Sequence, residues 1–162
     1  MATSNLSKTS IRVPMAGIVA SASPNVLETL LGSCVGIALW CKETQLGALA
    51  HVMLSDSQGC QKQPGRFVDT AILEMLKQLA ANGARRRAIV AKVCGGANMF
   101  KISSPGQEVG RKNIDKSLEL LKANNIPVIS KHVGGTSGRV IYFDLETSLI
   151  QVKIGHEFVA TV

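Results

Sequence analysis

Two residues with reactive side chains, Cys34 and His51, lie at matching ends of two neighbouring apolar segments. Cys34 precedes the run from Val35 to Trp40, and His51 lies near the end of the run from Leu46 to Leu54. The polar residues 42–45 between the runs predict the tip of a β-hairpin, whose two strands face each other residue by residue. We therefore expect the hairpin to bring the thiol of Cys34 and the imidazole of His51 to one end of a sheet.

A cysteine beside a histidine has the chemistry of a nucleophile with its general base. The pKa of free cysteine is about 8.5, so the thiol is a poor nucleophile until a base takes its proton. The imidazole of His51 can take that proton and then, once charged, stabilise the thiolate of Cys34. The Gly32-Ser33 turn before the cysteine can direct backbone N–H groups at a developing oxyanion. Spacing alone leaves a structural role open, because buried cysteines usually pack as small apolar side chains.

Thr29 offers a further polar group to the same site. It lies on the apolar run from Val26 to Leu31, a predicted strand that leads directly into the turn at Cys34. The segment 94–96, Cys-Gly-Gly, ends another predicted strand and indicates a tight turn beside a site. It lacks the Lys-Ser/Thr pair that a phosphate-binding loop requires.

The remaining histidines and cysteines favour neither a metal site nor disulfide bonds. We expect His132 and His156 to be structural or exposed, since no carboxylate pair accompanies them at metal-ligand spacing. The cysteines are scattered, without CxxC spacing, and no export signal precedes them, which favours free thiols in a reducing compartment. They are Cys34, Cys41, Cys60 and Cys94.

Composition is that of one globular domain. The chain has 162 residues, of which 46% are hydrophobic and 18% charged, and no apolar run approaches the roughly 18–20 residues of a membrane span. We interpret residues 1–10 as a flexible tail and 11–162 as a single domain. The net charge of +7 favours an acidic partner, either nucleic acid or an acidic protein surface. Nucleic acid is the weaker alternative, because only 4% of residues are aromatic and able to stack on bases.

The pattern along the chain predicts more strands than helices. Apolar residues at helical spacing predict helices over 67–82 and from 109 or 110 to 124. Besides the hairpin and the run before it, strands are predicted over 11–19, 88–93, 127–133, 139–144 and 149–154, the third and fourth of these joined by the glycine-rich turn 134–138. A strand-rich chain with two helices and mostly hairpin connections indicates an antiparallel or mixed sheet layer covered by helices.

Six segments carry a resemblance to a known family. They are LGSCVGIALW (31–40), AHVML (50–54), RFVDTAI (66–72), KVCGGANMF (92–100), VGRKN (109–113) and VGGTSGRVIYFDLETS (133–148). Together and in this order, they resemble the chemoreceptor glutamine deamidase family CheD of bacterial chemotaxis. LGSCV followed by HVML at this separation is the specific part of the resemblance. Ser55 and Ser148 stand where the family commonly has proline and glycine.

The resemblance implies an α/β fold, a three-layer sandwich with mixed, largely antiparallel sheets and two main helices, related to cysteine deamidase toxins. It implies that Cys34 is the nucleophile and His51 its acid–base partner. Thr29 is the implied third catalytic residue, with Ser33 as the alternative orienting or oxyanion group.

The implied activity is that of a protein-glutamine glutaminase, which hydrolyses glutamine side chains to glutamate on methyl-accepting chemotaxis receptors. The resemblance implies a cytoplasmic enzyme with no cofactor, no metal, no nucleic-acid partner and no membrane insertion. Members of the family also bind the phosphatase CheC. A non-catalytic adaptor that binds receptors or CheC is the alternative hypothesis.

Overall fold

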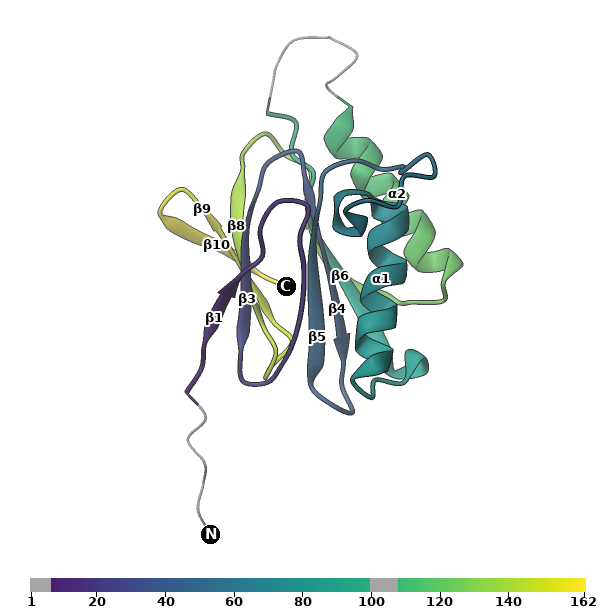
Figure 1. The fold of residues 1–162 in the computed structure, drawn as a ribbon. Coiled ribbons are helices and arrows are strands. Elements are labelled where there is room, and N and C mark those ends of the chain that lie inside the picture. The colour runs from purple at the N-terminus through teal and green to yellow at the C-terminus, as the bar shows by residue number, and fades with distance from the viewer. Residues whose placement is uncertain (1–6, 100–107) are drawn as a thin grey trace.

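The computed structural model describes residues 7–99 and 108–162, and these form two five-stranded sheets and two α-helices in three layers (Figure 1). Sheet A has the strand order β1-β3-β8-β9-β10, and sheet B has the order β2-β5-β4-β6-β7. Both α-helices cover the face of sheet B that points away from sheet A. The three-layer α/β fold is therefore confirmed.

The strands of sheet A are β1 (Ser10–Arg12), β3 (Val26–Leu31), β8 (Arg139–Asp144), β9 (Ile150–Ile154) and β10 (Glu157–Thr161). Those of sheet B are β2 (Ile18–Ala22), β4 (Val35–Cys41), β5 (Leu46–Val52), β6 (Ile89–Gly95) and β7 (Val128–Val133). The helices are α1 (Val68–Ala81) and α2 (Val109–Ala123), with short 3₁₀ turns at Pro64–Arg66 and Arg86–Ala88. Only the pairs β1–β3 and β6–β7 are parallel, so pairing is largely antiparallel, as expected.

Burial along the strands follows from these layers. In β3 every second side chain is buried, and Leu30 between two of them is 65% exposed, because one face of sheet A meets water. Sheet B is the middle layer, so β4 and β5 are buried almost continuously on both faces. One apolar core, including Ile37 and Val93, lies between sheet B and the helices. A second, including Leu27 and Phe143, lies between the sheets.

The helix α1 shows how local sequence dictates an element. Its buried side chains recur at helical spacing and face sheet B, while Asp69 in the first turn complements the positive end of the helix dipole. The helix ends before Asn82-Gly83, where Gly83 adopts a positive φ of 96° that side chains other than glycine rarely allow. Both predicted helices are confirmed within two residues at their ends.

The strand predicted over 11–19 is wrong. The structure divides it into β1 in sheet A and β2 in sheet B, with a turn between them in which the N–H of Gly17 donates to the carbonyl of Pro14 at 2.8 Å. Proline has no N–H to continue a ladder, so the chain leaves one sheet there and enters the other.

The predicted hairpin between 127–133 and 139–144 is also wrong. The first strand, β7, pairs in parallel with β6 in sheet B, and the second, β8, pairs with β3 in sheet A. The glycine-rich segment 134–138 therefore crosses between layers, helped by positive φ at Gly134 and Gly135. The sequence interpretation also missed β10, which extends sheet A beyond β9.

The N-terminal segment is anchored before the boundary placed at residue 10. Ser10 is the first residue of β1, and the ammonium of Lys8 lies 2.6 Å from the carboxylate of Asp144. Residues 1–6 lie outside the described part of the chain, so the tail over 1–10 stays a prediction. Neither helix in the described ranges has the length and apolar character needed to cross a bilayer.

Candidate active site

The hairpin of β4 and β5 places the predicted pair on one face of sheet B. Val35 pairs with Val52 and Gly36 with His51, so Cys34 lies opposite Met53, one step beyond the paired strands. Cys34 lies in the bend 32–34 just before β4, and its side chain packs against the inter-sheet core, the side on which His51 meets Thr29 of sheet A. The hairpin prediction is confirmed, with its tip at residues 42–45.

That shared face points into the space between the two sheets. A Cβ atom added at Gly36 would lie 3.0 Å from the side chain of Leu31 and 3.1 Å from that of Ile141, both of which belong to sheet A. The absence of a side chain at Gly36 keeps the sheets close beside the imidazole of His51. Cys34 packs at the edge of the same inter-sheet core and is half-buried.

Thr29 of β3 holds the ring of His51 from the opposite sheet. Its hydroxyl oxygen lies 2.8 Å from His51 Nδ1 and 2.8 Å from the carbonyl oxygen of Val13. A carbonyl only accepts, so the threonine hydroxyl gives its one proton to Val13 and accepts a proton from Nδ1. The proton of neutral His51 is therefore on Nδ1, and the lone pair is on Nε2.

His51 Nε2 is free to act as a base. This atom is buried and has no hydrogen-bond partner within residues 7–99 and 108–162, although 4% of the residue remains exposed. Burial lowers the pKa of His51 below its ordinary value. Burial also raises the pKa of the Cys34 thiol, which its own backbone N–H partly counteracts. Both shifts favour a neutral imidazole and a protonated thiol over an ion pair.

The backbone around Cys34 is fixed by the segment that follows β6. Gly96 N–H donates to the carbonyl of Cys34 at 2.8 Å, and Ala97 N–H donates to that of Gly32 at 2.9 Å. A Cβ atom at Gly95 would come within 2.5 Å of the Cys34 carbonyl oxygen, so only glycine permits this approach. The strand does end at these glycines, but residues 96–99 are coil and not the tight turn predicted there.

The other predicted polar groups lie in different surroundings. The Ser33 hydroxyl makes no hydrogen bond within the described residues, and the backbone carbonyl of Ser33 accepts one from Asn113. His132 is bound to Arg139, and His156 is exposed in the turn between β9 and β10. The structure therefore brings Thr29, and not the hydroxyl of Ser33, to the imidazole of His51. Sequence reasoning missed Asn113, whose only signal was its place in the VGRKN segment.

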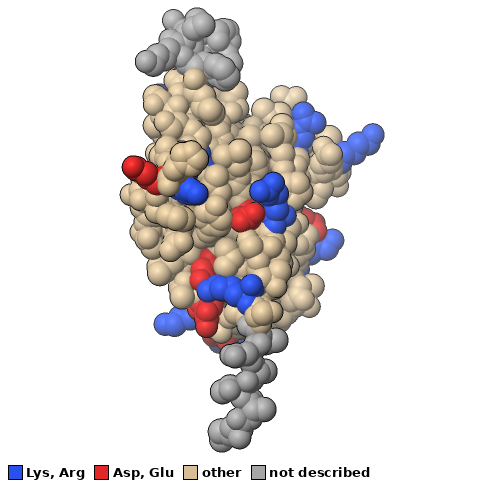
Figure 2. Space-filling model, turned by 90° about the vertical axis from the view of Figure 1, so that its left-hand side faces the viewer, with Lys and Arg blue, Asp and Glu red and all other residues tan. Residues whose placement is uncertain are grey.

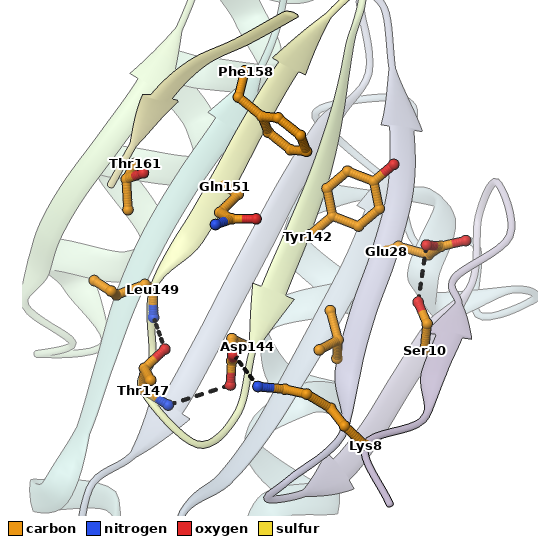
Figure 3. Close-up of a pocket in the computed structure, with 11 residues that line it drawn as sticks. Lys8, Ser10, Glu28, Tyr142, Asp144, Thr147, Leu149, Gln151, Phe158 and Thr161 are labelled. Carbon is orange, nitrogen blue, oxygen red and sulfur yellow. Dashed lines mark hydrogen bonds and ion pairs between the residues drawn. The ribbon is translucent and has the colours of Figure 1, made fainter. Parts of the chain in front are cut away.

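Two hollows differ in their relation to this pair. A cavity of about 380 Å³ beside the end of β1 is lined by Thr29 and His51, together with Met15 and Leu30. A larger one, of about 740 Å³, lies on the outer face of sheet A, where Figure 3 shows Tyr142 and the other lining residues. None of the predicted site residues lines the larger hollow.

The outer face of sheet A carries few charges for a protein with a net charge of +7. Figure 2, which views the molecule from that side, shows mostly uncharged side chains with basic groups next to acidic ones. Ion pairs at sheet A join Lys8 to Asp144 and Arg12 to Glu28. The visible, described part of this face therefore presents no continuous basic patch to an acidic partner.

A half-buried cysteine and a histidine bound by a hydroxyl are the residue types with which a cysteine hydrolase works. A family model described as CheD chemotactic sensory transduction matches residues 53–154. A protein of Methanococcus vannielii named "Probable chemoreceptor glutamine deamidase CheD" is 43% identical over 148 residues, covering 91% of this chain and 96% of its own. "Chemoreceptor glutamine deamidase CheD" of Halalkalibacterium halodurans is 34% identical over 153 residues, covering 91% and 94%. The chain belongs to the CheD family.

Proposed function

We propose that this protein is a protein-glutamine glutaminase that converts glutamine side chains of methyl-accepting chemotaxis receptors to glutamate in the cytoplasm. One observation carries the proposal: His51, bound at Nδ1 by Thr29, keeps a basic nitrogen without a partner among residues 7–99 and 108–162, on the inter-sheet side where Cys34 also packs. The names of the relatives, chemoreceptor glutamine deamidases, support the choice of substrate.

In the first half-reaction, Cys34 Sγ attacks the carboxamide carbon of the receptor glutamine. His51 Nε2 takes the thiol proton as the S–C bond forms, which suits a pair that starts uncharged. The carbonyl electron pair moves onto oxygen, which accepts a hydrogen bond from the Cys34 backbone N–H. The C–N bond then breaks as His51 returns the proton to nitrogen, and ammonia leaves behind a thioester.

In the second half-reaction, water resolves the thioester. His51 Nε2 takes a proton from water as its oxygen attacks the thioester carbon, and the C–S bond breaks to release glutamate. The proton returns to the sulfur of Cys34. The sum is amide plus water giving acid plus ammonia, with the enzyme unchanged and no cofactor consumed.

Thr29 acts in this scheme by holding the ring. Its hydroxyl accepts the Nδ1 proton at 2.8 Å and is itself fixed by donating to Val13, so the imidazole keeps Nε2 as its basic atom through both steps. Thr29 supplies no proton to the substrate. Because the hydroxyl of Thr29, and not that of Ser33, binds His51, Thr29 is the third residue of the proposed site.

The test is mass spectrometry of a purified receptor cytoplasmic fragment before and after incubation with the protein. We expect the mass increase of an amide-to-acid conversion at particular glutamines with the native protein and none with Cys34→Ala. A non-catalytic adaptor would bind the fragment without changing its mass. Full conversion by Cys34→Ala would instead show that another residue is the nucleophile.

We also propose the phosphatase CheC as a regulatory partner, on the family resemblance. The measurement is co-purification of the two proteins, followed by deamidation assays with and without CheC. A stable complex that changes the deamidation rate is the expected result. Failure to form a complex at micromolar concentrations would remove CheC from the proposal.

A further inference from the structure

One buried amide links the two strand ends that carry the proposed catalytic pair. Asn113 lies on α2, is 1% exposed, and donates from Nδ2 to the carbonyl of Met53 at 2.9 Å and to that of Ser33 at 3.4 Å. Ser33 directly precedes Cys34, and Met53 is the second residue after His51. The side chain of one residue in the helical layer thus bridges the open end of the hairpin in sheet B.

This bridge lies where the backbone ladder of the hairpin has ended. The last pair joins Val35 to Val52, and the N–H of Met53 already donates to the carbonyl of Arg66. Beyond that pair, no hydrogen bond between the two backbones of the hairpin sets the separation of the strand ends. Instead, the amide of Asn113 joins the two strand ends by binding the carbonyls of Ser33 and Met53.

The same contact orients the peptide that leads into Cys34. The described chain contains one cis peptide bond, at Ser23-Pro24, so the Ser33–Cys34 peptide is trans, with its C=O and N–H on opposite sides. Asn113 on α2 binds the Ser33 carbonyl, so the Cys34 N–H points away from that helix. The same N–H lowers the pKa of the Cys34 thiol.

The surroundings of Asn113 indicate that its amide is not there for packing alone. Its Oδ1 is buried without a hydrogen-bond partner among residues 7–99 and 108–162. An unpaired buried acceptor lowers stability, and an apolar side chain of similar size would avoid that cost. Ser117 holds the backbone carbonyl of Asn113 at 2.6 Å, one turn further along α2. What the position gains from asparagine is its pair of donors.

We propose that Asn113 is a positioning residue for the deamidation reaction. It directs the Cys34 N–H toward the oxyanion of the tetrahedral intermediate and fixes the distance between the Cys34 and His51 strands. The proposal rests on the proposed function for its catalytic meaning. The geometric claim about the Cys34 peptide is separate and can be measured without receptor.

The experiment compares Asn113→Leu and Asn113→Ala with the native protein. We expect kcat for receptor deamidation to fall about 10- to 100-fold with KM little changed, less than the 10²- to 10³-fold of losing an oxyanion donor outright. We also expect alkylation of Cys34 by iodoacetamide to shift to higher pH, because its N–H no longer faces the sulfur. Thermal unfolding of each variant sets an assay temperature at which it is folded, and Asn113→Ala keeps the test open should the leucine variant misfold.

The control is Asn124→Asp, at the end of the same helix. Asn124 Nδ2 donates to the carbonyl of Leu120 at 2.8 Å, so this variant loses a helix hydrogen bond without touching the hairpin. We expect its kcat and alkylation profile to match the native protein. An Asn113 variant that is folded and keeps both native values, or a control that loses as much, would overturn the proposal. If the native protein fails to deamidate the receptor, the proposed function alone is wrong. The alkylation profile still tests whether Asn113 orients the Cys34 peptide.

Discussion

Sheet B contains two corners in which a cysteine and a histidine come from neighbouring strands. In one, Cys34 directly precedes β4, and His51 lies in the paired strand β5. In the other, Cys94 of β6 pairs directly with His132 of β7. By residue type and pairing alone, the second corner is the closer thiol–imidazole pair. The two nevertheless have opposite chemical character.

The difference lies in the group that binds each imidazole. Thr29 accepts a proton from Nδ1 of His51, which leaves Nε2 as a buried base without a partner in the described chain. Arg139 donates to Nδ1 of His132 at 2.7 Å, which occupies the basic nitrogen of that ring. Burial and then the guanidinium charge lower the pKa of His132. The hydroxyl of Thr29 thus leaves the lone pair of His51 on Nε2, whereas Arg139 occupies the lone pair of His132 on Nδ1.

Access separates the two thiols as well. Cys34 is half-buried at the edge of the inter-sheet core, whereas Cys94 is fully buried and burial raises its pKa to about 11. Arg139 also donates to the carbonyl of His132 at 2.8 Å and to that of Gly134, so its role is to hold the crossing between layers. We expect chemistry at the first corner and structural support at the second.

Replacing each cysteine by alanine should separate the corners most strongly. Cys34→Ala removes the proposed nucleophile and should lower receptor deamidation by on the order of 10⁴-fold or more. Cys94→Ala should leave the deamidation rate within about threefold of native and cost about 1 kcal/mol of unfolding free energy. Mass spectrometry of the receptor fragment and urea unfolding measure the two effects. Equal losses of activity in Cys34→Ala and Cys94→Ala would contradict the assignment of chemistry to the first corner alone.

Replacing each histidine by glutamine is the next most sensitive comparison. His51→Gln removes the general base and should lower kcat about 10²- to 10⁴-fold. His132→Gln deprives Arg139 of an acceptor, so it should cost about 1–3 kcal/mol of stability with kcat near native. Steady-state kinetics at saturating receptor fragment and thermal unfolding report these changes. A kcat that falls further for His132→Gln would reverse our assignment.

The hydroxyl that distinguishes the first corner can be removed and restored. Thr29→Val leaves His51 Nδ1 without its acceptor, which costs about 1–3 kcal/mol. This is about 5- to 150-fold in kcat if the cost appears wholly in the barrier. Thr29→Ser keeps the hydroxyl and should recover most of that rate. If valine and serine variants behave alike, the threonine acts through its methyl group and our account of the ring is wrong.

The pH dependence is the mildest of these tests. Because burial lowers the pKa of His51, deamidation should stay constant as pH falls to its ordinary value of 6.5 and decline only below it. The unfolded state binds the His51 proton first, so unfolding free energy should also be lost below pH 6.5, and less so in His51→Gln. Cys34 should alkylate mainly above the pKa of about 8.5 of a free cysteine, and Cys94 at still higher pH. A rate that already declines above pH 6.5 contradicts the neutral pair.

Local pattern was sufficient for the elements that local contacts form. The hairpin follows from two apolar runs around a polar tip, and its register alone puts Cys34 and His51 on one face. The helix over 68–81 follows from apolar spacing and the Asn82-Gly83 stop. In these cases the residues that decide the structure are neighbours in sequence.

Only the tertiary structure distinguishes the surroundings of the two corners. The bond between Thr29 and His51 joins residues 22 apart and two different sheets, and that from Asn113 to Ser33 spans 80 residues and two layers. The division of 11–19 between sheets and the crossing at 134–138 likewise depend on which layer each segment packs against. The sequence supplied the reactive side chains and their shared strand face. Their protonation, burial and orientation came from contacts between distant segments, which no local pattern encodes.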